Sequence, residues 1–355
     1  MWLLLRGGVG SATADGPRGC LRLVSPSRHT VMFTAPLQFS PLLKRIRWGG
    51  RRLGTRLGKP LGPENDYAES WELVDHGQDQ SRVISGPWTG RTLQELVQRE
   101  AKTLLGTQAG LEQFPLLVKF LDAHDRLSVQ VHPNDRQAAA AIPGERGKTE
   151  AWVILEAEPQ ACVFAGLKPG VDRAALARAV ETGTVEQCLH RLEVRPGDCI
   201  FIPAGTVHAL GEGVLLAEVQ QSSDITYRLH DWNRLGPDGR PRPLHIEASL
   251  ECTDFARGPV GPQVPQPLPG WGPIARERLV AADSFTLDRL QGTGPATLPP
   301  ASHSRIWIIV AGAVRWGATD GDTAGLGSTL LWAAATGPVE LQWSPGTVVI
   351  EATWP

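Results

Sequence analysis

Short strand-like runs separated by glycine and proline fill this chain from Phe33 onwards and constrain its fold more than any other feature. The 355 residues include 39 glycines and 29 prolines, which interrupt the sequence too often for long helices. Strand-length runs such as YAESWEL and TEAWVILEA lie between these breaks, and only residues 92–105 and 171–192 have apolar residues at helical spacing. The pattern predicts a mainly β chain, a sandwich or barrel with many turns and short helical segments.

Changes in composition along the sequence divide the chain into four parts. Residues 1–31 have an apolar block too short for a secretory signal, so we expect a disordered extension, or a true start at Met32. Residues 32–262 are expected to form the main domain, and the proline-rich stretch at 263–270 is expected to be a linker. Residues 271–355 contain a single histidine and no clustered metal-ligand types, and we expect a second, smaller β-domain without a metal site.

Composition excludes several classes of function. The formal net charge is −2, so the overall charge does not favour nucleic acid or an anionic membrane as a partner. No run of 18 apolar residues occurs, so no membrane-spanning helix is expected. The five cysteines are odd in number and widely separated, which argues against a disulfide framework and favours a cytoplasmic location.

The stretch SVQVHPND, residues 128–135, alternates polar and apolar side chains and then ends in a turn. In a strand, Ser128, Gln130 and His132 share one face, and the two valines share the other. The valine face fits a core. The opposite face offers an amide oxygen and an imidazole, and is either a solvated or hydrogen-bonded sheet face or one half of a metal site.

The stretch GDCIFIPAGTVHALG, residues 197–211, carries the most information. Its apolar residues before the turn are expected to form a buried strand, and Gly205 permits the positive φ of a tight turn. A strand that restarts at Thr206 is expected to form a hairpin, which returns His208 to the interior. The spacing G-x5-P-x-G-x2-H resembles the second signature of the cupin barrels, although Glu212 replaces its terminal asparagine.

The first cupin signature usually has two histidines two residues apart, followed by a carboxylate. Here a glutamine replaces the first histidine, and Glu150 follows His132 by 18 residues. This variant resembles the type I mannose-6-phosphate isomerases, as do GKTEAWVILEA, AEVQQSSDITYRLHDWNR and LHIEASL, which occur in the family's order. The gap of 58 residues from Glu150 to His208 is similar to that of the compact bacterial subgroup, which lacks a large helical insertion.

The resemblance implies a cupin domain that binds one Zn²⁺ ion per chain and interconverts mannose 6-phosphate and fructose 6-phosphate through a cis-enediolate. The implied metal ligands are Gln130, His132, Glu150 and His208. Zinc accepts two imidazoles, a carboxylate and an amide oxygen, but Mn²⁺, Fe²⁺ and Co²⁺ tolerate the same ligands. For either imidazole alone, a hydrogen-bonded interior histidine is the alternative.

The resemblance also implies a set of pocket residues. Arg228 matches the family's active-site arginine and is suited to grip a phosphate or stabilise enediolate charge. Lys148 shares its strand face with Glu150 and is a candidate for proton transfer, and Glu218 is a candidate general base if burial raises its pKa. A purely structural ion pair or hydrogen bond is the alternative for each. The expected substrate contacts are Ser128, Glu69, Asp224, Arg234 and His245.

Two other functions stay open: a cupin isomerase for another sugar phosphate, and a non-catalytic sugar-phosphate-binding cupin. All four metal-ligand positions are retained, as are Arg228 and Lys148, and no helix-turn-helix pattern is found. An enzyme is therefore favoured over a sensor, with a small sugar phosphate as partner and a monomer or homodimer as the expected assembly. The choice of mannose 6-phosphate depends on the resemblance alone, because a fold does not define a substrate.

Overall fold

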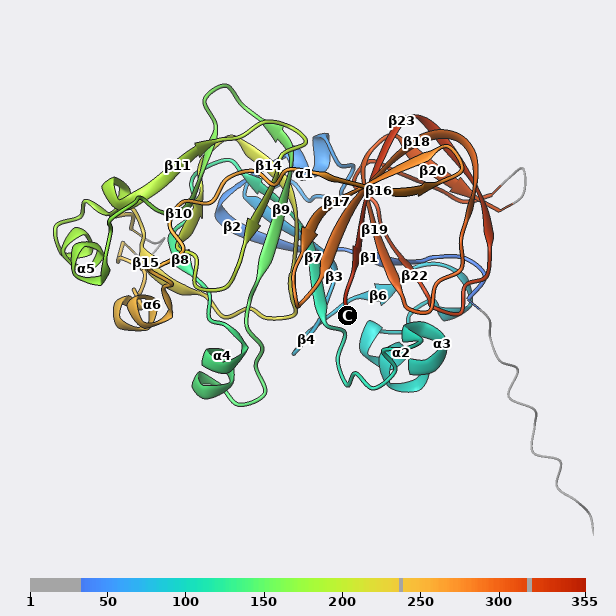
Figure 1. The fold of residues 1–355 in the computed structure, drawn as a ribbon, viewed down its shortest axis with the longest axis horizontal. Helices are drawn as coiled ribbons and strands as arrows, with labels where there is room; N and C mark the ends of the chain where they lie inside the picture. The colour runs from blue at the N-terminus through green and yellow to red at the C-terminus, as the bar shows by residue number, and fades with distance from the viewer. Residues whose placement is uncertain (1–32, 236–238, 318–320) are drawn as a thin grey trace, which may run out of the picture. The chain divides into compact units, whose positions relative to one another are not determined.

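The computed structural model describes residues 33–235, 239–317 and 321–355. The extension expected at residues 1–31 lies outside the described residues. Most elements are β-strands in antiparallel sheets (Figure 1), which confirms the expected mainly β fold. Within the described ranges, no helix is long and apolar enough to cross a membrane.

The strands of two sheets contain Gln130, Glu150 and His208 of the predicted metal ligands, and His132 follows directly after one of them. These strands also contain Glu69, Glu218 and Arg228 of the other predicted site residues. The first sheet has six strands in the order β12-β9-β14-β7-β3-β2, and the second has five in the order β11-β10-β13-β8-β15. The six are Cys199–Ile202, Glu150–Ala157, Val214–Gln221, Leu116–Ala123, Tyr67–Leu73 and Leu42–Gly50. The five are Leu189–Glu193, Cys162–Leu167, His208–Leu210, Val129–Val131 and Tyr227–His230.

Residues from both sheets share one buried apolar cluster. Leu121 and Ile154 of the six-stranded sheet belong to this cluster together with Val163 and Leu210 of the five-stranded sheet. Burial of such a cluster between two sheets is the main source of stability in a sandwich. The paired sheets agree with the cupin-type jelly roll that the sequence predicts.

The turn before His208 does not form the expected hairpin. β12 pairs with β9 in the six-stranded sheet, whereas β13 pairs with β10 and β8 in the five-stranded sheet. Gly205 has a φ of 85°, and an added Cβ would lie 3.2 Å from the Asp254 Cβ. The turn therefore carries the chain from one sheet to the other. Because the sheets share a core, His208 is still buried between them.

Helices cover the outer face of the five-stranded sheet (Figure 1). Val129 and Val131 belong to a buried cluster with residues of these helices, which confirms that the valine face of SVQVH packs in a core. The segment 171–192 is less helical than expected, because Leu189 begins β11 and pairs with β10. The helical elements here are α5 (Arg173–Glu181), a 3-10 turn (Val185–Cys188) and α6 (Ile246–Cys252).

The remaining helices are short. Thr92 and Glu95 form a capping box at the start of α2, in which each side chain bonds the backbone N–H of the other residue. Asn134 and Gln137 do the same at α4. The elements are α1 (Arg52–Thr55), α2 (Leu93–Arg99), α3 (Ala101–Leu105), α4 (Asp135–Ala141) and the 3-10 turn Gly86–Trp88. α2 and α3 confirm the helical segment predicted at 92–105.

The C-terminal strands form a ten-stranded sheet in the order β16-β17-β18-β23-β19-β22-β1-β6, in which β20 also pairs with β23, and β21 pairs with β20. From β16 to β23 the strands are Gln266–Trp271, Ile274–Ala281, Thr286–Leu298, Arg305–Ala311, Ala313–Trp316, Thr323–Gly325, Thr329–Trp332 and Val339–Thr353. The others are β1 (Leu37–Ser40) and β6 (Arg82–Val83), and β4 (Asp75–His76) and β5 (Asp79–Gln80) form a separate pair.

The expected linker at 263–270 is mostly a strand instead. β16 pairs with β17 at the edge of the ten-stranded sheet. Pro267 and Pro269 are tolerated there, because one side of an edge strand needs no backbone N–H. β1 also crosses the expected domain boundary, since Leu37 pairs with Leu331 of β22.

Alternate residues of β19 face two different cores. Ile306 and Ile308 belong to a cluster that includes Val153 of the six-stranded sheet. Trp307 and Ile309 belong to a separate cluster made of C-terminal residues and Ala35, which we call the tryptophan core. The period-two alternation of a strand produces this division.

Candidate metal centre and active-site pocket

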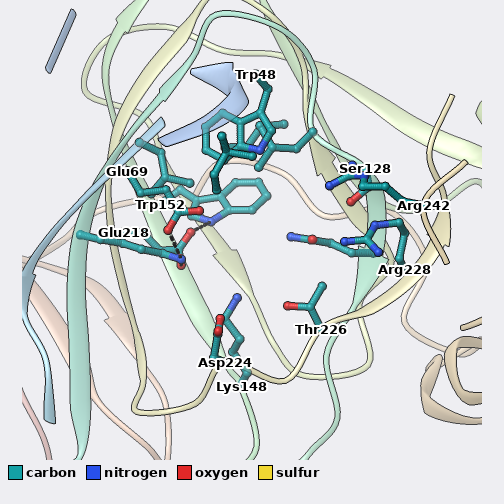
Figure 2. A pocket seen from close by; sticks show the side chains of 16 residues that line it. Trp48, Glu69, Ser128, Lys148, Trp152, Glu218, Asp224, Thr226, Arg228 and Arg242 are labelled. Atoms are coloured by element: carbon teal, nitrogen blue, oxygen red, sulfur yellow. Dashed lines mark hydrogen bonds and ion pairs between the residues drawn. The ribbon is translucent and has the colours of Figure 1, made fainter. Parts of the chain in front are cut away.

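A cavity of about 310 Å³ is lined by side chains from both sheets of the sandwich (Figure 2). Ser128, Gln130 and Arg228 of its wall come from β8 and β15 or their ends. Lys119 and Glu218 come from β7 and β14 of the facing sheet. The cavity therefore collects residues that are far apart in the sequence, from Ile46 to Arg242.

Four residues form a row across the six-stranded sheet. Trp71 lies opposite Lys119, Lys119 lies opposite Glu218, and Glu218 lies opposite Trp152. Directly opposite residues on neighbouring strands point to the same face, so the row presents two indoles, a cation and a carboxylate together. The five-stranded sheet supplies a second row, in which His208 lies opposite Gln130 and Gln130 lies opposite Arg228.

Three buried side chains, His132, Glu150 and His208, converge between these rows. Their ligand atoms lie within 4.8 Å of one another. His208 Nε2 lies 3.2 Å from Glu150 Oε1, and His132 Nε2 lies 3.5 Å from Glu150 Oε2. The Gln130 amide reaches the same point, with its Nε2 atom 3.2 Å from His208 Nε2. Rotation of this amide group by 180° places its oxygen atom, instead of Nε2, at the same point.

Backbone carbonyls fix the orientation of both imidazoles. His132 Nδ1 lies 2.9 Å from the carbonyl oxygen of Ile225, and His208 Nδ1 lies 2.9 Å from that of Thr206. With Nδ1–H donating to these carbonyls, each Nε2 atom carries its lone pair towards Glu150. This hydrogen bond behind the ligand is the usual arrangement of a metal-binding histidine.

Burial keeps the two imidazoles neutral. It lowers the pKa of His208 to about 4, and burial together with the Lys148 ammonium lowers the pKa of His132 well below its usual value. A metal ion binds the neutral imidazole, so these pKa values favour binding. Two imidazole nitrogens, a carboxylate and an amide therefore fit a divalent metal, and no thiol of the described residues belongs to this group.

Lys148 lies between this cluster and the cavity. Its Nζ atom is 3.0 Å from His132 Nε2 and 3.0 Å from Glu150 Oε2, and it also lines the cavity. The side chain is buried, so its charge acts at short range and with little screening by water. Lys148 precedes β9, which begins at Glu150, so it does not share a strand face with Glu150 as expected, although its ammonium contacts that carboxylate.

Lys119 lies between two buried carboxylates on the facing sheet. Its Nζ atom is 3.3 Å from Glu69 Oε2 and 3.2 Å from Glu218 Oε1. Indole N–H groups hold the same carboxylates, since Trp71 donates to Glu69 over 2.6 Å and Trp152 donates to Glu218 over 3.0 Å. Each carboxylate is thus fixed by one cation and one neutral donor.

The two carboxylates differ in acidity. Burial, reinforced by the nearby Glu150 carboxylate, raises the pKa of Glu218. Burial opposes ionisation of Glu69 as well, but the Lys119 ammonium and the Trp71 indole hold the pKa of Glu69 below its usual value. Two carboxyl groups whose environments separate their pKa values are typical of an acid–base site.

Two of the predicted substrate contacts, Arg234 and His245, do not reach the cavity wall. The Arg234 guanidinium donates to the Asp231 carboxylate over 2.7 Å and to Asp125 over 3.2 Å, and only 11% of its side chain is exposed. His245 Nδ1 accepts the backbone N–H of Arg228 over 3.1 Å. Both therefore lie behind the wall. The predicted residues that do line the cavity are Glu69, Ser128, Gln130, Lys148, Glu218, Asp224 and Arg228.

The wall residues that were not predicted from the sequence include Lys119, Trp152 and Arg242. Lys119 interrupts the apolar run LLVKFL, and a lone charge in a buried strand needs a partner, which was a usable signal. Trp152 shares the strand face of Glu150, which was also visible. Arg242 follows the irregular stretch after β15, where no periodicity fixes the direction of a side chain.

Several known proteins are similar to this chain in sequence and in fold. Residues 37–160 match the type I phosphomannose isomerase catalytic domain. The mannose-6-phosphate isomerase ManA of Bacillus subtilis is 41% identical over 223 residues, which are 63% of this chain and 69% of that protein. This chain belongs to the type I phosphomannose isomerase family. A mannose-6-phosphate isomerase of Streptococcus mutans is 33% identical over 280 residues, or 79% of this chain and 86% of that protein.

A solved structure extends the match to nearly the whole fold. The crystal structure of the mannose 6-phosphate isomerase from Bacillus subtilis superposes with a TM-score of 0.81 at 29% identity. It covers 90% of this chain and 99% of the solved one. This phosphomannose isomerase family member therefore has the family's cupin-type fold, including the C-terminal sheet.

Proposed function

We propose that the protein interconverts mannose 6-phosphate and fructose 6-phosphate, with one Zn²⁺ ion held by Gln130, His132, Glu150 and His208. The observation that carries this proposal is that a buried metal-ligand group with two neutral imidazoles lies beside a cavity whose wall contains Gln130, Lys148 and a buried lysine–carboxylate network. Membership of the family and the names of the relatives support the substrate.

The reaction moves one proton between neighbouring carbons of the open-chain sugar. A base takes the proton from C2 of the aldose and returns it to C1, while O2 loses a proton and O1 gains one. When bound, the metal supplies positive charge that polarises a sugar oxygen and stabilises the negative charge of the enediolate. The remaining tasks belong to the side chains of the cavity wall.

Glu218 and Lys148 are the candidates for proton transfer. Burial raises the pKa of Glu218 towards the range in which a carboxylate is an effective base near neutral pH. The Trp152 indole holds one of its oxygens, which fixes the orientation of the carboxylate. Lys148, just before β9, which is the strand paired with β14, lies beside the metal ligands and is suited to move protons to and from the sugar oxygens.

Arg228 is proposed to bind the phosphate group. A guanidinium binds phosphate through two parallel N–H groups, and the fixed position of Arg228 favours this arrangement. Its Nη1 atom donates to the carbonyl oxygen of Pro243 over 3.0 Å, and its backbone is held by His245. Ser128, Glu69 and Asp224 are proposed to contact the sugar hydroxyls, whereas Arg234 and His245 act from behind the wall.

The cysteines outside the site support a cellular location. The four cysteines within the described ranges are free, and burial raises the pKa of Cys199 and of Cys252 to about 12. Free, unreactive thiols support a reducing cytoplasm as the location. A monomer or homodimer is the proposed assembly.

The test is coupled turnover of mannose 6-phosphate by the purified protein as isolated, after chelation, and after Zn²⁺ is restored. We expect activity to vanish with the chelator and to return with the metal. A zinc-loaded, folded protein that does not turn over mannose 6-phosphate would contradict the substrate, and other sugar phosphates would then be compared. Full activity of protein shown to be free of metal would contradict the metal requirement.

A further inference from the structure

Arg242 brings a second guanidinium to the same side of the cavity as Arg228. Both line its wall, and Figure 2 shows them together on one side, with Glu69 and Glu218 on the other. The carboxylates opposite already share a cation, because Lys119 pairs with both. The positive charge on the Arg228 side is therefore not balanced by the carboxylates across the cavity.

Asp231 holds Arg242 in place. Its Oδ2 atom accepts from Arg242 Nε over 2.7 Å, and its Oδ1 atom accepts from Arg242 Nη2 over 2.6 Å. Asp231 is 5% exposed. Although burial opposes it, hydrogen bonds from Arg242 and Arg234 hold the pKa of Asp231 below its usual value. This bond engages one edge of the Arg242 guanidinium, and leaves the Nη1 edge available to another acceptor.

Arg228, on the same side of the cavity, has a hydrogen-bond donor that is not used. Its Nε atom is buried and has no hydrogen-bond partner among the described residues. Burial, with the Arg242 charge adding to it, lowers the pKa of Arg228, so the two cations repel each other. They are also linked by the backbone, because Arg228 donates to the carbonyl of Pro243, the residue after Arg242. A dianion between them would relieve the repulsion and supply acceptors for both.

We propose that Arg242 is a second phosphate-binding residue, which acts together with Arg228, and that Asp231 is the positioning residue that orients it. This inference depends on the proposed function, because it assigns the phosphate of that substrate to the Arg228 side of the cavity. It also gives a role to Arg234, which does not line the cavity. Arg234 shares the Asp231 carboxylate and supports the pair, rather than contacting substrate.

The decisive variants are Arg242→Gln and Arg242→Lys. Binding of inorganic phosphate and of mannose 6-phosphate is measured by calorimetry, and KM and kcat by turnover. Loss of a charge-assisted bond to phosphate corresponds to about 10- to 100-fold weaker binding. We expect this loss for Arg242→Gln, a smaller loss for Arg242→Lys, and a raised KM with kcat changed by less than about threefold.

Asp231→Asn tests the positioning role. The amide keeps the size of the side chain but loses its charge, so we expect weaker phosphate binding than in the parent, by less than in Arg242→Gln. Arg173→Gln is the matched control, since Arg173 forms an exposed ion pair with Glu247 on the helices outside the sheets. It should bind phosphate as the parent does. Thermal unfolding of each variant separates loss of binding from loss of fold.

Two results would overturn the proposal. One is a folded Arg242→Gln protein that binds inorganic phosphate and mannose 6-phosphate as tightly as the parent. The other is a fall in kcat with KM and phosphate affinity unchanged, which would place Arg242 at the reacting carbons instead. Failure of the proposed function is distinguishable, because it abolishes turnover in the parent protein but leaves the calorimetric comparison of phosphate binding intact.

Discussion

The sandwich core and the tryptophan core are built from the same kind of antiparallel strand, and they differ in what those strands bury. Between the two sheets of the sandwich lie Lys119, Lys148, Glu150 and Glu218, all less than 6% exposed. The tryptophan core instead stacks indoles edge to face, with Trp307 5.4 Å from Trp332 and 5.6 Å from Trp343 between ring centroids.

Both cores contain a tryptophan whose indole N–H donates to a buried glutamate, but the surroundings of the two glutamates differ. Trp152 donates to Glu218 beside the cavity, and Trp307 donates to Glu351 over 2.9 Å. Glu218 lines a cavity, whereas Glu351 is not among the residues that line the described pockets and pairs with Arg276. Buried charges cost desolvation energy, so a core that retains them around open space is arranged for chemistry rather than for stability.

The largest effect is expected from His208→Ala, which removes a ligand from the sandwich core. Loss of the metal's charge stabilisation, worth several kcal/mol, corresponds to a fall in kcat/KM of about 10³-fold or more. Metal content by mass spectrometry should fall with activity, while the fold persists by circular dichroism. His303→Ala, in the C-terminal part, is the control and should keep both. Retained activity in His208→Ala would remove the basis for this metal site.

Lys119→Met should produce the largest change in stability. It leaves Glu69 and Glu218 buried without their shared cation, and breaking a buried pair costs about 3–5 kcal/mol. The measurement is the free energy of unfolding in urea. Adding Glu218→Gln to Lys119→Met should recover part of the loss, and Lys168→Met, on the surface, should have little effect. An unchanged free energy in Lys119→Met would mean that the network is not strained by its charges.

Trp307→Phe should have a smaller effect and on stability alone. It removes the indole N–H from Glu351 and some volume from the tryptophan core, which together cost about 2 kcal/mol. The Tm should fall while kcat/KM of the folded protein stays within about twofold of the parent. If the fully folded variant lost much of its kcat/KM, the two cores would be functionally coupled. The tryptophan core would then contribute to activity as well as to stability.

The smallest effect is a pH dependence of stability in metal-free protein. His208 has a folded pKa of about 4, below the 6.5 of the unfolded chain, so the unfolded state binds more protons below pH 6.5. Its contribution is full above pH 6.5 and is lost as the pH falls towards 4. Between pH 7 and 5.5 the loss is about 1 kcal/mol. His208→Gln should flatten this slope in urea unfolding, and an identical slope would refute the assignment.

Local periodicity was enough to predict many of the strands, whereas the roles of the site residues came from the resemblance to a family. YAESWEL is β3 in full, and the parity of SVQVH separates the valines from Gln130 correctly. The chain positions of His132, Glu150 and His208 matched a known signature, and the structure brings these residues together. The strands and their parity depend on patterns within single strands, whereas the ligand set, drawn from three distant segments, depended on the resemblance.

The errors concern pairing between distant segments. The turn at Gly205 has the composition of a hairpin, but which sheet receives β13 depends on β8 and β10, which are far away in sequence. β16 has the prolines of a linker and is a strand only because β17 pairs with one of its edges. Arg234 and Arg242 are both arginines in an irregular segment, and only the folded position of Asp231 decides which faces the cavity.

The crossing of the chain at Gly205 has a thermodynamic consequence. Glu150 belongs to one sheet, His208 belongs to the other, and His132 directly follows β8 of that second sheet, so any ion that binds all three fastens the sheets to each other. Such an ion binds the folded sandwich and not the separated sheets, so its affinity and the cohesion of the sandwich are one linked quantity. A substitution that loosens the sheets far from the cavity will therefore lower metal affinity, and zinc in excess will restore the melting temperature that it cost.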